Sequence, residues 1–270
     1  MGAVPLSASR YELWAPPCFG IDRLLRSSTC REPIGPLDLR ALAFLARRLG
    51  AVRSPTQAEC SLPELAAAVY GRSVGGSDRR ALEASLHRLE AAVVTLEGCD
   101  LVAGELAAAL TRAPLFRAVS VAESPARLRY EFSPWLAGAV AQGRFPRLDL
   151  GVLRSLSATA ARLWALLEGT ERFEAHVEGR DALVVPLDEH LHDALALGHA
   201  RAVDARRTLR LAAAEVVAAD PRYVELAVRR TRPGWVLRVE RVTWEPSYDQ
   251  PDAVARHRLR PLTGGALRLR

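Results

Sequence analysis

Arginine is the residue type of this sequence that is best suited to binding a charged partner. All 37 of the Lys and Arg residues are arginine, against 31 Asp and Glu, and the formal net charge is +6. A guanidinium group is a planar fork that donates two parallel hydrogen bonds, which suits phosphate groups and the edge of guanine. A GC-rich genome also favours arginine over lysine, so the positions of the arginines say more about function than their number.

The positive charge is concentrated at one end of the chain. Residues 201–270 contain 15 Arg against 8 acidic residues, a net of +7, whereas residues 1–200 contain 22 Arg against 23 acidic residues, a net of −1. This asymmetry indicates a polyanionic partner for the C-terminal region. A solvated basic face that binds nothing is the alternative.

Arginines of this region fall on a predicted helix over residues 201–219 and on a hairpin that follows it. With Leu209 as the buried centre and about 100° per residue, Arg207 lies opposite it and Arg210 on the flank. Arg206 borders the buried line, and Arg201 stands at the N-terminal end, where the helix dipole favours phosphate. Hairpin arginines suit phosphates or the minor groove. We predict that these residues bind double-stranded DNA: Arg201, Arg206, Arg207, Arg210, Arg229, Arg230 and Arg232.

An earlier predicted helix, which begins near Asp78, offers a weaker basic face. Its buried stripe is formed by apolar residues at regular helical spacing, namely Leu82, Leu86, Leu89 and Val93. We predict that arginines away from this stripe also bind DNA: Arg79, Arg80 and Arg88. Glutamates dilute the charge here, namely Glu83, Glu90 and Glu97. A surface for a partner or for self-association is therefore an equally good interpretation of this helix.

No motif in the sequence predicts catalysis. The triplet His190-Leu191-His192 matches the metal-binding pair of rolling-circle nickases, which requires a strand. Here the pair falls on a predicted helix, where residues i and i+2 diverge by about 200°. We therefore expect two surface histidines, with a nickase as the least favoured alternative. Without lysine no Walker A site can form, so no nucleotide cofactor is predicted. Since no other motif predicts catalysis, we also predict no catalytic residue and no metal.

The remaining composition is typical of a cytoplasmic protein. No run of about eighteen apolar residues predicts a membrane helix, and the N-terminus does not resemble a secretion signal. The cysteines are scattered, which is typical of reduced thiols: Cys18, Cys30, Cys60 and Cys99. We expect the tryptophans to anchor cores rather than to stack on bases: Trp14, Trp135, Trp164, Trp235 and Trp244.

Two successive sets of elements are predicted to position these side chains. The first has a helix from Pro36 to a stop at Gly50, a short helix capped by Ser61 and Glu64, and the helix near Asp78. Strands over 115–122 and 127–132 follow, with an inserted helix over 101–111. The second has helices over 153–167, 188–197 and 201–219, and strands over 182–187, 223–230 and 235–242. A turn at Thr231–Gly234 joins the last two strands.

This order predicts an α+β, mainly helical fold of two tandem winged-helix (helix-turn-helix) domains with β-hairpin wings. A local repeat supports it: Leu62, Gly71 and Leu82 have counterparts in Leu187, Gly198 and Leu209. We predict an irregular N-terminal arm (1–35), a first winged-helix domain (36–145), a second one for the main DNA contacts (146–246) and a flexible basic tail (247–270).

In several motifs the chain resembles the iteron-binding plasmid replication initiators. The run Phe132-Ser133-Pro134 matches the end of that family's first wing, and residues 162–167 match its "Arg-Leu-aromatic-x-Leu-Leu" helix. Arg206-Arg-Thr-Leu209 and the following strands are similar to its DNA-reading helix and wing. Trp164 stands where the family usually has tyrosine, and the recognition helix lacks the family's lysines. The resemblance spans about residues 36–245.

The resemblance implies an initiator that binds direct repeats at an origin and uses no cofactor. Monomers would help to open an adjacent AT-rich region and recruit host replication proteins, whereas homodimers formed through the first domain would repress the promoter. A winged-helix transcriptional regulator is the alternative, because both classes need the same groove-reading chemistry.

Overall fold

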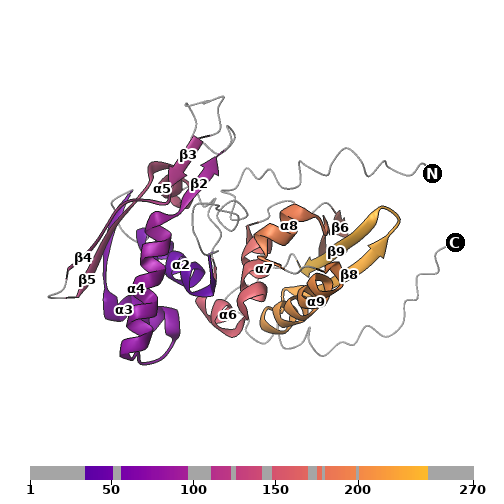
Figure 1. Cartoon of the computed structure of the whole chain (residues 1–270), viewed down its shortest axis with the longest axis horizontal. Coiled ribbons are helices and arrows are strands. Elements are labelled where there is room, and N and C mark those ends of the chain that lie inside the picture. The colour runs from indigo at the N-terminus through magenta and orange to yellow at the C-terminus, as the bar shows by residue number, and fades with distance from the viewer. Residues whose placement is uncertain are drawn as a thin grey trace.

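The two halves of the chain repeat one order of elements in the computed structural model (Figure 1). The structure describes residues 34–50, 56–96, 111–122, 126–141, 148–169, 175–177, 180–198 and 201–242. The N-terminal unit (described residues 34–141) contains α2 (Pro36–Gly50), β1 (Gln57–Ser61), α3 (Leu62–Tyr70), α4 (Gly76–Ala91), β4 (Phe116–Ala122) and β5 (Arg127–Phe132). The C-terminal unit (described residues 148–242) contains α7 (Ala158–Glu168), β7 (Arg180–Pro186), α8 (Glu189–Ala194), α9 (Ala202–Ala219), β8 (Tyr223–Thr231) and β9 (Gly234–Val242).

The sheets of the two units have the same topology. In the N-terminal unit the antiparallel order is β1-β5-β4, and in the C-terminal unit β7-β9-β8 is extended at one edge by β6 (Ala175–Val177). In both, the strand directly before the short helix (α3 or α8) pairs with the last strand, and the hairpin projects from the helices (Figure 1). The fold is therefore mixed helix and small antiparallel sheet, as predicted at that level.

The short helix α6 (Leu150–Ser155) lies between the two units and packs against α2 and α3 (Figure 1). Its Arg154 donates from Nη1 to the backbone oxygen of Ala68, at the end of α3, over 3.0 Å. Gly71 follows α3 with a φ of 68°, and a Cβ there would lie 2.8 Å from Arg154 Nη1. The left-handed backbone favours glycine at this position, and the Arg154 side chain packs over it.

The start of α3 confirms the predicted cap, with one difference. Ser61 Oγ accepts a hydrogen bond from the backbone N–H of Glu64 at 3.1 Å. The Glu64 carboxylate does not complete the box but accepts from Arg48 at 3.0 Å, which ties α3 to α2. The cap is therefore partly local and partly a contact between helices.

Each unit has an apolar core that includes buried polar contacts. In the N-terminal unit, leucines of α2 and α4 pack on a cluster of Phe116, Tyr130 and Phe132, and the Tyr130 hydroxyl donates to Leu45 O at 2.7 Å. In the C-terminal unit, Trp164 is fully buried and donates from Nε1 to Asp220 at 2.9 Å. Trp135 and Trp164 thus confirm the prediction that tryptophans anchor cores.

Several predicted elements need correction. The helix predicted over 153–167 is two helices, α6 and α7, because Leu156 is extended and the Ser157 N–H donates to Glu215 of α9. The helix predicted over 188–197 ends at Ala194, and Ala196 takes a φ of 51°. Strands β1, β2 (Val93–Leu96), β3 (Thr111–Pro114) and β6, and helix α5 (Pro134–Ala141), were not predicted.

Other predictions fall on residues outside those described. The N-terminal arm up to residue 33, the tail and most of the inserted helix over 101–111 belong to this group, and the inserted helix's last residue, Thr111, begins β3. Within the described chain, no helix is both long and apolar enough to cross a membrane.

Candidate nucleic-acid interface

Helix α9 presents a mixed face of arginines and apolar residues to solvent. Its opposite face packs on α7 through Leu209, Val216 and three alanines, whose small size allows close packing. Arg207 and Arg210 are exposed, as predicted from Leu209 as the buried centre. Beside them Val203 is 64% and Leu211 61% exposed, which leaves two large apolar side chains uncovered on the outer face.

The N-terminal end of α9 carries Arg201 at the cap position. No side chain caps this end, and the Arg201 side chain is exposed. The free backbone N–H groups of a helix N-terminus and an adjacent guanidinium both attract anions. This arrangement agrees with the predicted place of Arg201, although Asp204 in the first turn offsets part of the charge.

The hairpin of β8 and β9 brings a second group of arginines to the surface. Its turn is closed by Thr231 Oγ1, which donates to Gly234 O at 2.9 Å, and Gly234 has a φ of 153°. Arg230 and Arg232 are exposed at this tip. Arg229 differs from them, because it forms an ion pair with Glu225 on the same strand and part of its charge is offset.

Trp235 joins the helix to the hairpin. Arg206 Cζ lies 4.6 Å and Arg210 Cζ 5.7 Å from the centre of its ring. Trp235 is half-buried rather than a core anchor, so the expectation for this tryptophan was wrong. The sequence signal that could have identified the contact is the spacing of the arginines, which are one helical turn apart beside the predicted wing.

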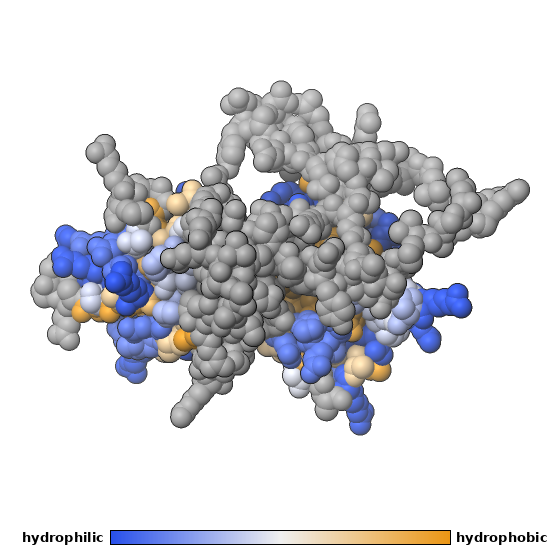
Figure 2. Space-filling view, turned by 90° about the horizontal axis from the view of Figure 1, so that it is seen from above, coloured by the Kyte–Doolittle hydropathy of each residue, from blue (hydrophilic) through white to orange (hydrophobic). Residues whose placement is uncertain are grey.

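The positive charge of this surface is largely uncompensated. Among the residues that the structure describes, no carboxylate forms an ion pair with the arginines of the outer face and tip: Arg201, Arg206, Arg207, Arg210, Arg230 and Arg232. Figure 2 shows hydrophilic side chains at both ends of the molecule, and the right-hand end is formed by the C-terminal unit. Helix α9 and the hairpin therefore form one basic surface.

In the N-terminal unit the predicted arginines do not share one surface. Arg79 and Arg80 are exposed in the first turns of α4. Arg88 points inward, where its Nη2 donates to Asp38 at 3.0 Å; Ser85 Oγ also donates to Asp38, at 2.5 Å. Arg88 therefore holds α4 against α2, and its DNA contact remains a prediction that the geometry does not favour. Sequence reasoning missed this network because Asp38 lies 50 residues away in the chain.

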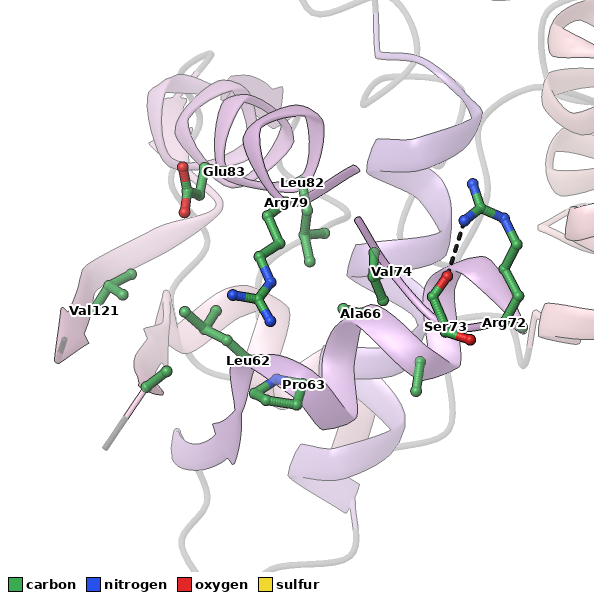
Figure 3. Close-up of a pocket in the computed structure, with 13 residues that line it drawn as sticks. Leu62, Pro63, Ala66, Arg72, Ser73, Val74, Arg79, Leu82, Glu83 and Val121 are labelled. Carbon is green, nitrogen blue, oxygen red and sulfur yellow. Dashed lines mark hydrogen bonds between the residues drawn. The ribbon is translucent and has the colours of Figure 1, made fainter. Parts of the chain in front are cut away.

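A groove of about 790 Å³ opens beside α4 in the N-terminal unit (Figure 3). Its floor is apolar and includes Leu62, Ala66 and Leu82, and it continues to Val121 of the hairpin. Arg79 points from α4 into the groove, and Glu83 lies at its rim (Figure 3). The groove thus occupies the junction of helix and hairpin that Trp235 fills in the C-terminal unit.

The histidine pair lies on a helix and not on a strand. His190 and His192 lie on α8, as predicted, and no group of three potential metal ligands was found within the described ranges. Cys60 is buried in β1, and burial raises the pKa of its thiol to about 11, which makes it a weak nucleophile at neutral pH.

The fold is similar to that of a known replication initiator. The crystal structure of the Pi initiator protein in complex with iteron DNA matches with a TM-score of 0.58 and 16% identity, over 82% of this chain and 95% of that chain. Two crystal structures of RctB domains 2 and 3 match with TM-scores of 0.47 and 0.49 at 12% identity, over 76% and 78% of this chain and 81% and 83% of theirs. No protein-family model and no curated protein matches the sequence. The resemblance to iteron-binding initiators is confirmed at the level of the fold.

Proposed function

We propose that this protein is a sequence-specific, double-stranded-DNA-binding replication initiator of a plasmid or secondary replicon, acting in the cytoplasm. Its two units are tandem winged-helix domains over residues 36–145 and 146–246. The observation that carries the proposal is the uncompensated basic surface of α9 and the β8–β9 hairpin, on a fold shared with an initiator solved on iteron DNA. The protein needs neither a catalytic residue nor a cofactor for this role.

In this proposal α9 is the recognition helix of the C-terminal unit. A major groove about 12 Å wide admits one α-helix, whose outer face reads base edges. Arg207 and Arg210 donate to guanine or phosphate, and the exposed Val203 and Leu211 contact thymine methyl groups. Arg230 and Arg232 bind phosphates or the minor groove beside the helix.

The N-terminal unit is proposed to serve as a second DNA reader through Arg79 and Arg80, and as the homodimer interface. Its weaker charge supports this division of labour, because Glu83 and Glu90 are exposed on the same helix. Binding to direct repeats, opening of the adjacent DNA and recruitment of host replication proteins complete the proposed role.

The experiment is protection footprinting of the DNA upstream of the gene, with a variant of the recognition helix. The combined Arg206→Ala, Arg207→Ala and Arg210→Ala variant should lose about 1–3 kcal/mol of site discrimination for each base-contacting arginine. A matched control, Arg47→Ala, removes an exposed arginine at the end of α2 and should bind like the parent protein. A folded triple variant that binds as tightly as the parent contradicts the assignment of α9.

A transcriptional regulator would bind the same DNA without supporting replication. A plasmid that carries the upstream region should replicate only when the gene is supplied, and the triple variant should fail to support it. Promoter repression with no effect on plasmid maintenance would favour the regulator.

A further inference from the structure

We propose that Trp235 is a positioning residue that holds Arg206 and Arg210 as an ordered pair for binding to DNA phosphates. The inference rests on the proposed function, since it assumes that the surface of α9 and the hairpin binds DNA. It adds a residue that contacts the arginines rather than the DNA and that determines how well this surface binds.

The backbone of Trp235 is held in the sheet, and its ring contacts two arginines of α9. Its backbone lies at the start of β9, where it pairs with Arg230, and its carbonyl oxygen accepts the N–H of Leu187 at 2.9 Å. Above the ring lie the guanidinium groups of Arg206 and Arg210, at 4.6 and 5.7 Å from its centre. The indole therefore links the sheet to α9 through the two arginines.

Contact with Trp235 leaves the positive charge of Arg206 and Arg210 uncancelled, because the indole ring carries no net charge. Arg206 and Arg210 are one helical turn apart, so their like charges repel each other. A carboxylate would remove this repulsion but would also cancel the attraction for phosphate, whereas an aromatic face attracts cations without carrying a net charge. Arginines that are already ordered lose less side-chain entropy when they bind.

The N-terminal unit shows that the fold itself does not require this tryptophan. Buried residues of α4 at 82, 85, 86 and 89 have the same spacing as those of α9 at 209, 212, 213 and 216. By this correspondence Arg79 stands in the place of Arg206, and Glu83 in the place of Arg210.

The sheet gives the same correspondence independently. The Leu62 N–H donates to Ala126 O at 3.0 Å, in the same way that the Leu187 N–H donates to Trp235 O. Ala126 therefore takes the place of Trp235, and it lines the open groove of Figure 3. The same junction folds with alanine, so the tryptophan together with two arginines is a special feature of the more basic unit.

The experiment compares Trp235→Tyr and Trp235→Leu in the full chain, using a labelled mixed-sequence duplex of about 30 base pairs, because phosphate binding does not depend on sequence. Tyrosine keeps an aromatic face, whereas leucine keeps apolar volume only. We expect the tyrosine variant to bind within about threefold of the parent and the leucine variant about tenfold more weakly. Both should unfold at similar urea concentrations.

A background without the arginines separates positioning from folding. When Arg206 and Arg210 are both alanine, Trp235→Leu should cause no further loss of affinity, because the residues through which it acts are gone. An equal loss in both backgrounds, or a leucine variant that binds like the parent, overturns the proposal. A parent protein that shows no salt-dependent binding to the duplex would instead overturn the proposed function.

Discussion

At the scale of single residues, two buried carboxylates organise the units. Asp38 is fully buried and accepts hydrogen bonds from the Gly35 N–H, Ser85 and Arg88. Arg162 of α7 lies close enough for Asp38 to act on its pKa, which burial lowers to about 10. A buried charge is tolerated only where such partners replace water. Asp38 therefore links α2 to α4 and also acts across the boundary between the units.

Asp220 has the corresponding role in the C-terminal unit and makes stability depend on pH. Burial alone would raise its pKa, but hydrogen bonds from Arg222 and Trp164 outweigh burial and hold the pKa below its ordinary value. Because the folded pKa is depressed, the stabilisation is complete above about pH 4 and is lost as the pH falls through the folded pKa.

The loss of stability at low pH gives a prediction for the Asp220→Asn variant. The variant should have a lower free energy of unfolding than the parent at pH 7. The difference should shrink as the pH falls from about 4, where the unfolded parent takes up a proton, toward the lower pKa of the folded protein. Urea unfolding of both proteins between pH 3 and pH 7 measures it. A difference that stays constant down to pH 3 would show that the charge of Asp220 contributes nothing.

At the scale of elements, the end of α3 is predicted to be intolerant of side chains. Gly71→Ala should lower the free energy of unfolding by about 1–2 kcal/mol, because alanine is strained in the left-handed region and its Cβ would press on Arg154. Urea unfolding measures the loss. Gly76→Ala is the matched control: a Cβ there meets nothing within 4 Å, so it should be neutral or slightly stabilising. Equal effects of the two substitutions would contradict the account of α3 and α6.

The hairpin of β8 and β9 is predicted to add phosphate contacts that depend on salt. Removing Arg230 and Arg232 together should lower the slope of log affinity against log salt by about 1 per arginine. Arg229→Ala should change the slope less, because Arg229 is already paired with Glu225. Binding titrations at several salt concentrations measure the slopes. An unchanged slope in the double variant would show that the hairpin does not contact DNA phosphates.

At the scale of the whole molecule, the two units are predicted to contribute unequally to DNA binding. Replacing Arg201 and Arg207 by alanine should cost about 2 kcal/mol, roughly a 30-fold loss of affinity. Replacing Arg79 and Arg80 in the same way should cost less than about 1 kcal/mol, because glutamates share the surface of α4. Titration of both variants against one duplex tests the difference. Equal losses would mean that the charge asymmetry of the sequence does not carry over to binding.

Much of the fold could be predicted because its signals are local. The signals are the apolar spacing of α2, α4 and α9, the cap at Ser61, the stop at Gly71 and the turn before Gly234, and each acts within a few residues. The edge strands β1 and β6 could not be predicted, since they are short and depend on partners far away in the chain. The break between α6 and α7 depends likewise on Glu215, 58 residues from Ser157.

For the candidate interface, the concentration of arginines in the C-terminal region and the elements on which they lie can be read from the sequence, because charge and helical period are properties of the chain. Which arginines are available for binding depends on the packing of the folded protein. It turned Arg88 toward Asp38, paired Arg229 with Glu225, and placed Trp235 beneath Arg206 and Arg210. These outcomes depend on which buried or neighbouring group a side chain meets, and the packing of distant segments determines that group.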